Sequence, residues 1–128
     1  MKTLTIEGTL KTPNVMFDGS TGIMEIKGRS IPENTLEFYT VLVEWLGKYS
    51  QNPQPQTVMN IHFEYFNTST SKVLLDVFKK LEIIQEINQG VTVNWLYDEG
   101  DEDMMDAGED YSGIMSKIPF KITEAIAS

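Results

Sequence analysis

The chain has 128 residues, no cysteine and a single histidine, and its 10 basic and 19 acidic residues give a formal charge of −9 at pH 7. The lack of cysteine excludes a disulfide framework, a thiolate zinc site and a cysteine nucleophile. The negative charge argues against binding to nucleic acid or to an anionic membrane, because both depend on clustered lysine and arginine. We therefore expect the partners of this chain to be proteins.

Length and apolar content predict one domain, residues 1–128. The hydrophobic share of 41% is ordinary for a globular domain and too high for a disordered one. No apolar run approaches the roughly 18 residues of a membrane span, and no apolar signal segment follows Met1-Lys2. These features predict a cytoplasmic protein without membrane insertion.

The first part of the chain predicts three short strands and a helix. Residues 3–6 alternate polar and apolar, and residues 15–17 and 23–27 flank a glycine-containing turn typical of a hairpin. Ser30-Ile31-Pro32-Glu33 combines a capping residue, a proline and a glutamate three places on, which predicts a helix start at Ser30. The side chains expected to face the core from this helix are Leu36, Tyr39, Val43 and Leu46, with Trp45 as a further candidate.

The central part predicts a strand followed by the longest helix. Apolar or aromatic residues stand at every second position from Met59 to Tyr65, which is the period of a half-buried strand. A three- and four-residue apolar spacing then predicts a helix with one buried face. Its buried residues are expected to be Leu74, Val77, Phe78, Leu81, Ile84 and Ile87. Asn88-Gln89-Gly90 ends the helix, where glycine suits a left-handed cap.

The last part predicts a strand at 91–97, a third helix and an edge strand at 118–122. The segment from Asp98 to Asp110 has eight acidic residues and no basic ones. Apolar residues nevertheless recur there at roughly helical spacing, namely Met104, Ala107, Tyr111, Ile114 and Met115. Pro119 fits a strand at the edge of a sheet, where it interrupts no central ladder.

The strands are apolar on one face only, so helices should cover a single face of the sheet. The predicted fold class is therefore an α/β two-layer sandwich with a mixed β-sheet. If the strands at 23–27, 57–65 and 91–97 are parallel, the three helices that follow them begin at the same edge. The carboxyl ends of parallel strands are where α/β proteins usually place their sites. The segments expected to meet at that edge are 32–34, 67–71 and 98–103.

A cluster of hydrogen-bonding side chains, Asn67-Thr68-Ser69-Thr70-Ser71, stands at the start of the central helix. Any one of them could cap the helix by accepting a bond from a free backbone N–H, and the residues alone favour this role. The alternative is a phosphoacceptor. A phosphate there would bring about −1.5 to −2 charges to the positive end of the helix dipole and change the charge shown to a partner.

The sequence predicts no catalytic set, no metal and no cofactor. His62 has no second histidine or cysteine with which to form a usual zinc site. The acidic segment does not match a calcium loop, and no P-loop, G-x-G-x-x-G or G-x-S-x-G motif is present. A small enzyme or ligand-binding domain based on the carboxylates of 98–103 is the alternative. Those carboxylates would also repel a phosphate on the hydroxyl cluster.

The segment from Tyr65 to Lys72, followed by Leu74-Leu75-Asp76-Val77-Phe78, resembles the SiaC family of bacterial regulatory phosphoproteins. The similarity continues through further motifs: Thr12-Pro13, Ile31-Pro32-Glu33-Asn34, Trp95-Leu96-Tyr97-Asp98, Asp101-Glu102-Asp103-Met104 and Ile118-Pro119-Phe120. The resemblance implies a STAS-like (SpoIIAA-like), anti-anti-sigma-like domain with a regulatory phosphate on Thr68. Thr70 and Ser71 are neighbouring hydroxyls that could accept it instead.

In such systems a dedicated protein kinase adds the phosphate and a PP2C-type phosphatase removes it. The unphosphorylated form binds and activates an effector, such as a diguanylate cyclase of cyclic di-GMP signalling. The partner-binding residues expected from this resemblance are Asn67, Thr68, Ser69, Ser71, Pro32, Glu33, Asn34 and Tyr65. A constitutive interaction or assembly module, in which Thr68 is only a helix cap, is the alternative.

Overall fold

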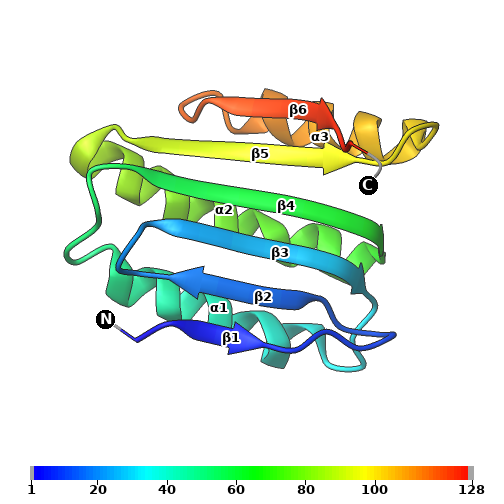
Figure 1. Ribbon diagram of the computed structural model, residues 1–128, viewed down its shortest axis with the longest axis horizontal. Coiled ribbons are helices and arrows are strands. Elements are labelled where there is room, and N and C mark those ends of the chain that lie inside the picture. The colour runs from blue at the N-terminus through cyan, green and yellow to red at the C-terminus, as the bar shows by residue number, and fades with distance from the viewer. Residues whose placement is uncertain (1, 127–128) are drawn as a thin grey trace.

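The computed structural model describes residues 2–126 and contains one six-stranded sheet with strand order β1-β2-β3-β4-β5-β6. The strands are β1 (Leu4–Ile6), β2 (Asn14–Asp18), β3 (Ile23–Ser30), β4 (Thr57–Phe66), β5 (Val91–Tyr97) and β6 (Phe120–Glu124). The first three strands pair antiparallel, and β3 to β6 pair parallel (Figure 1). The predicted mixed sheet is confirmed. Met1, Ala127 and Ser128 of the predicted domain lie outside the described residues.

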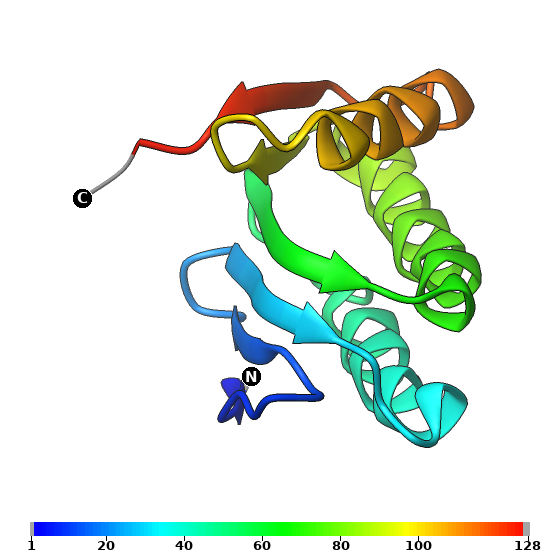
Figure 2. The same cartoon turned by 90° about the vertical axis from the view of Figure 1, so that its right-hand side faces the viewer.

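Three helices, α1 (Thr35–Tyr49), α2 (Thr68–Asn88) and α3 (Glu102–Ile114), cover one face of this sheet and leave the other open (Figure 2). The alternation of the strands explains this arrangement. In β4, Met59, Ile61 and Phe63 are fully buried, whereas Asn60 and His62 are partly exposed. The predicted two-layer α/β sandwich is therefore confirmed. None of the helices in residues 2–126 combines the length and apolarity needed to cross a membrane.

The parallel strands place all three helix starts at one edge of the sheet. Each of β3, β4 and β5 is followed by a helix, and each helix leads back to the next parallel strand. The helices therefore begin at the carboxyl ends of these strands, on the right in Figure 1. We call this side of the molecule the carboxyl edge.

The start of α1 differs from the prediction. Ser30 is not its cap but the last residue of β3, where it pairs with Phe66 of β4 and is fully buried. The cap is Asn34, whose Oδ1 accepts a bond of 3.0 Å from the Glu37 backbone N–H. Strand pairing with β4 thus overrides the local capping signal at Ser30. Leu36 was wrongly expected in the core, since it lies in the first turn and is 68% exposed.

A β-bulge in β4 corrects the prediction for Tyr65. Gly28 pairs with Phe63 and Arg29 pairs with Tyr65, so Glu64 is an extra residue without a partner in β3. Beyond the bulge the alternation shifts by one residue. Phe66 consequently packs against the core, whereas Tyr65, expected to face inward, is 51% exposed.

The helix ends also extend beyond the core. Ile87 and Ile114, predicted to be buried, are more than half exposed, because the buried faces of α2 and α3 end at Ile84 and Tyr111. Gln89, rather than glycine, adopts the left-handed cap conformation, with φ of 54°. Gly90 is required for a different reason, since a Cβ there would collide with the Pro55 carbonyl oxygen. Two smaller differences are that β6 begins at Phe120 and that Ile118 is buried in the preceding turn.

A chain of buried hydroxyls joins β3, α1 and α2 beneath the carboxyl edge. Ser30 Oγ lies 2.7 Å from Tyr39 Oη and 2.9 Å from Thr70 Oγ1, and all three residues are fully buried. Thr70 Oγ1 donates its proton to the Ser30 carbonyl oxygen at 3.1 Å. Because each hydroxyl has one proton, Ser30 must donate to Thr70 and Tyr39 must donate to Ser30. Burial raises the pKa of Tyr39, which keeps its phenol protonated as this donor requires.

The docking of α3 depends on close contact with Trp95 of β5. The indole is fully buried, and its Nε1 donates a bond of 2.9 Å to the Met104 carbonyl oxygen. Gly108 lies one turn later against the ring, where an added Cβ would overlap Cδ1 and lie 2.8 Å from Nε1. The side of α3 that faces the sheet therefore has no room for a side chain at Gly108.

Gly108→Ala should destabilise the protein by about 1–3 kcal/mol, because overpacking against the indole outweighs the better helix propensity of alanine. Gly113→Ala is the matched control on the same helix, because nothing lies within 4 Å of its added Cβ. The control should leave stability unchanged or raise it by up to about 1 kcal/mol. Urea unfolding of both variants measures the difference, and equal free energies of unfolding would contradict the close contact.

Thr70→Val should lower the free energy of unfolding by about 1–3 kcal/mol, because it keeps the shape but leaves the buried Ser30 hydroxyl without its acceptor. The Ser30 carbonyl oxygen keeps its bond of 3.1 Å from the Asn67 N–H. Thr40→Val makes the same chemical change at an exposed position of α1 and should stay within about 0.5 kcal/mol of the parent. Urea unfolding again gives both values. A Thr70→Val loss no larger than that of the control would show that the hydroxyl chain contributes little.

Candidate functional site

The three helix starts at the carboxyl edge are each capped by their own side chain. Asn34 caps α1, Asn67 caps α2 and Asp101 caps α3. In α2 the Asn67 Oδ1 accepts a bond of 2.9 Å from the Thr70 N–H, and Thr68 is the first helical residue. Asn67 rather than Thr68 therefore caps α2, so the capping role predicted for Thr68 is wrong.

The structure separates the hydroxyls of the cluster by their contacts. Thr70 is fully buried in the hydroxyl chain. Ser69 Oγ donates to Asn67 Oδ1 at 3.0 Å and lies 2.7 Å from Thr35 Oγ1, so Thr35 donates to Ser69. Ser71 Oγ donates to the Thr68 carbonyl oxygen at 2.6 Å.

Thr68 differs from these neighbours. Its side chain is exposed, and its hydroxyl makes no hydrogen bond to any residue in the described range 2–126. A reagent or enzyme could modify this oxygen without breaking an internal bond. Modification of Thr70 would first require the local structure to open.

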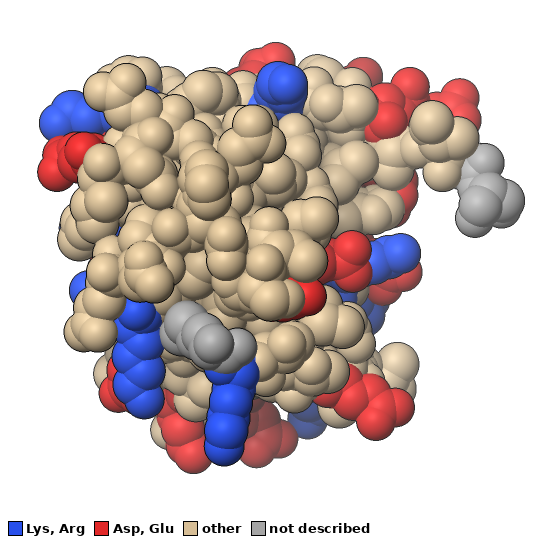
Figure 3. All heavy atoms as spheres, turned by 60° about the vertical axis from the view of Figure 1, so that its left-hand side comes forward, with Lys and Arg blue, Asp and Glu red and all other residues tan. Residues whose placement is uncertain are grey.

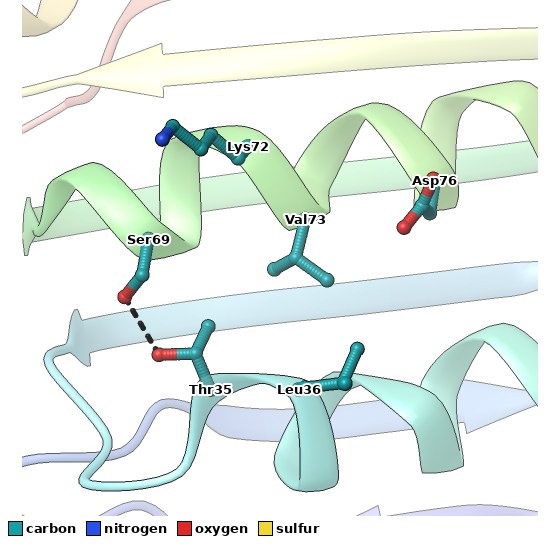
Figure 4. Close-up of a pocket in the computed structure, with 6 residues that line it drawn as sticks. All are labelled: Thr35, Leu36, Ser69, Lys72, Val73 and Asp76. Atoms are coloured by element: carbon teal, nitrogen blue, oxygen red, sulfur yellow. Dashed lines mark hydrogen bonds between the residues drawn. The ribbon is translucent and has the colours of Figure 1, made fainter.

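A hollow of about 280 Å³ lies between the start of α1 and that of α2, where Ser69, the residue after Thr68, lines it (Figure 4). Leu36 and Val73 give it an apolar wall, and the Thr35–Ser69 hydrogen bond crosses its amino end. Lys72 and Asp76 complete the lining from α2. The exposure of Leu36, which the core prediction missed, is explained by its place in this hollow.

A second hollow, of about 210 Å³, lies between the end of β4 and the start of α3. The bulge residue Glu64 and the exposed Tyr65 line it together with Asp101 and Asp103. The remaining lining residues are Phe66, Met104 and Ala107. The prediction that the acidic segment meets the other helix starts at one edge is therefore confirmed.

Individual acidic residues in this segment have structural partners. Asp98 Oδ1 lies 2.9 Å from His62 Nε2, and Asp101 Oδ1 accepts a bond of 3.1 Å from the Met104 N–H. His62 pairs with Leu96 across β4 and β5, so Asp98 lies two residues further along the same face. Within residues 2–126, no three histidine, aspartate or glutamate side chains are placed to hold a metal ion.

Tyr111 joins α3 to the first turns of α2 by a hydrogen bond. Its Oη donates a bond of 2.7 Å to the Ser71 carbonyl oxygen. Burial, with a smaller contribution from the carboxylate of Asp110, raises the pKa of Tyr111 to about 12. The phenol consequently stays protonated and remains a donor to the first turns of α2.

The other predicted partner-binding residues lie around the same edge. Glu33 and Asn34 are exposed before α1, and Glu33 pairs with Lys11 at 3.1 Å. Pro32 is buried beneath them. Tyr65 opens onto the second hollow rather than the first.

Charge is distributed unevenly between this edge and the opposite side of the molecule. Figure 3 views the side that bears the amino ends of the parallel strands, where uncharged side chains fill the centre and charged ones stand around the rim. The connector 51–56 on that side has no charged residue. Acidic residues at the carboxyl edge include Glu33, Glu37, Glu64, Asp98, Glu99, Asp101, Glu102 and Asp103.

Comparison with known proteins places this arrangement in a family. The model for the SiaC family regulatory phosphoprotein matches residues 6–125. An uncharacterized protein of Pseudomonas aeruginosa (strain UCBPP-PA14) is 30% identical over 125 residues, covering 95% of this chain and 96% of that protein.

Solved structures give the same result. Apo-SiaC from Pseudomonas aeruginosa superposes with a TM-score of 0.85 at 25% identity, over 96% of this chain and 99% of that one. SiaC as the activator in complex with the diguanylate cyclase SiaD, from the same organism, gives 0.88 at 28% identity, over 95% and 99%. The resemblance to SiaC and the STAS-like two-layer fold are thus confirmed. This chain belongs to the SiaC family of regulatory phosphoproteins.

Proposed function

We propose that this chain is a non-enzymatic regulatory protein of the cytoplasm that is switched by reversible phosphorylation of Thr68. The observation that carries the proposal is the state of Thr68, which is exposed and whose hydroxyl makes no hydrogen bond within the described part of the chain, whereas Ser69, Thr70 and Ser71 each make one. Membership of a family of regulatory phosphoproteins supports it. A protein kinase adds the phosphate and a PP2C-type phosphatase removes it.

The first turn of α2 can accommodate a phosphate without a change of fold. Thr68 is the first residue of a 21-residue helix, and that helix has no acidic residue in its first turn. The positive end of the helix dipole therefore meets the added charge of about −1.5 to −2. Since Asn67 rather than Thr68 is the cap, modification leaves the cap bond to Thr70 in place.

The unphosphorylated form binds and activates an effector, for which a diguanylate cyclase is the leading candidate. The related SiaC is the activator of the cyclase SiaD in their complex. The proposed docking surface is centred on the exposed Leu36 and the hollow beside it. The polar residues assigned to it around this hollow are Glu33, Asn34, Asn67, Ser69 and Ser71. Tyr65 belongs to it on the acidic side, where it lines the second hollow. A phosphate on Thr68 would add charge next to the apolar wall and weaken an apolar contact there.

Thr68→Ala should keep the protein in its effector-binding form. The free energy of unfolding should stay within about 0.5 kcal/mol of the parent, because the Thr68 hydroxyl makes no hydrogen bond to residues 2–126. Cyclic di-GMP production by a purified diguanylate cyclase of the source organism should rise equally with Thr68→Ala and with the unphosphorylated parent. Parent protein carrying phosphothreonine at position 68 should fail to raise it.

Asn67→Ala is the matched control next to Thr68. It should lower the free energy of unfolding by about 0.5–2 kcal/mol through loss of the cap while leaving the Thr68 hydroxyl in place. If the phosphorylated and unphosphorylated proteins stimulate the cyclase equally, Thr68 is not the switch. If both also bind it equally well, the chain is a constitutive interaction module.

A further inference from the structure

Lys72 lies one helical turn after Thr68 on α2. Residues four apart on a helix are neighbours on its surface, with Cβ atoms about 6 Å apart. The Lys72 side chain is exposed, and Figure 4 shows it extending back along α2 toward the amino end, on the side of Ser69. Its ammonium group is therefore directed toward the turn that contains the Thr68 hydroxyl.

The ammonium of Lys72 forms no ion pair with any residue from 2 to 126. Within residues 2–126 the ion pairs involve Lys11, His62 and Lys117. Asp76 lines the same hollow as Lys72 but lies at its other end, one helical turn further from Thr68 than Lys72 is. The first turns of α1 and α3 contain acidic residues, whereas that of α2 contains none.

We propose that Lys72 pairs with the phosphate on Thr68 and stabilises its dianion. This inference rests on the proposed function, because it assigns a residue to the same modification. A phosphate at the helix start is attracted both by the positive end of the α2 dipole and by the Lys72 ammonium. The pairing would hold the phosphate against the amino end of the hollow, next to the Thr35–Ser69 bond.

Carboxylates around the edge act in the opposite direction, and two further cations also lie there: Lys11, paired with Glu33, and Arg29, whose Nε donates to the Leu10 carbonyl oxygen. Glu33 and Glu37 flank the start of α1, Glu64 is the bulge residue of β4, and Asp101 and Asp103 stand at the start of α3. These carboxylates favour the singly charged phosphate. Within α2, Lys72 is the cation nearest in sequence to Thr68, so its removal should shift the balance toward the singly charged phosphate.

The test is the second pKa of the phosphate, measured by ³¹P NMR titration of the full chain with phosphothreonine installed at position 68 by semisynthesis. Lys72→Gln should raise that pKa by about 0.3 units, the shift that corresponds to an exposed i, i+4 ion pair. Lys79→Gln removes the same charge from an exposed position about 16 Å along α2 from Thr68. It should change the pKa by less than about 0.1 units at 0.15 M salt.

Equal shifts in the two variants would overturn the pairing, and so would no shift in either. Both variants change exposed side chains, so each should fold as the parent does. Because the phosphate is installed chemically, this result does not depend on whether cells phosphorylate Thr68. A pKa shift specific to Lys72, together with no effect of the phosphate on cyclase activation, would uphold the pairing and overturn the proposed function.

Discussion

The arrangement of the carboxyl edge depends on the buried hydroxyl chain from Tyr39 through Ser30 to Thr70. It joins the end of β3 to α1 and α2 at distances of 2.7 and 2.9 Å, in a region from which water is excluded. Satisfied polar networks in a core fix one arrangement, because any other leaves a buried group without a partner. The first turn of α2 is therefore held in a defined position relative to α1.

That constraint explains why neighbouring hydroxyls differ so sharply. With Thr70 fixed inside, helical geometry sends Thr68 outward and brings Ser69 to Thr35 across the gap between the helices. Asn67 supplies the cap, so Thr68 has no structural task in the described chain. A fixed first turn, with Thr68 as the residue of 67–71 whose side chain has no hydrogen-bond partner among residues 2–126, suits a modification that must signal without unfolding the domain.

Much of this fold follows from periodicity in the sequence. Alternation in 59–65 and 91–97 predicted one-faced strands, and the buried positions in 59–63 and 91–95 confirm it. The polar face of those strands correctly predicted an open side of the sheet. The parallel order of β3, β4 and β5 then brought the three helix starts together as expected. The choice of Thr68 came from the hydroxyl cluster and the family resemblance, and the structure adds the contacts that distinguish it from Thr70.

The sequence could not predict the features that depend on contacts between residues far apart in the chain. Ser30 and Thr70, which bond through their hydroxyls, are 40 residues apart. Ser30 also begins a sequence pattern typical of a helix cap, but it pairs with β4 as the last residue of β3 instead. The bulge at Glu64 has no sequence signal either, since the alternation from Phe63 to Tyr65 continues unbroken. The hollow beside Leu36 likewise appears only when two helices pack side by side.

The most direct test of the central claim is site mapping of phosphate by mass spectrometry on the protein taken from its own cells with phosphatases inhibited. The account predicts a fraction of the chain with one phosphate, located on Thr68. A phosphate on Ser69 or Ser71, or an unmodified chain under every growth condition tested, would contradict it.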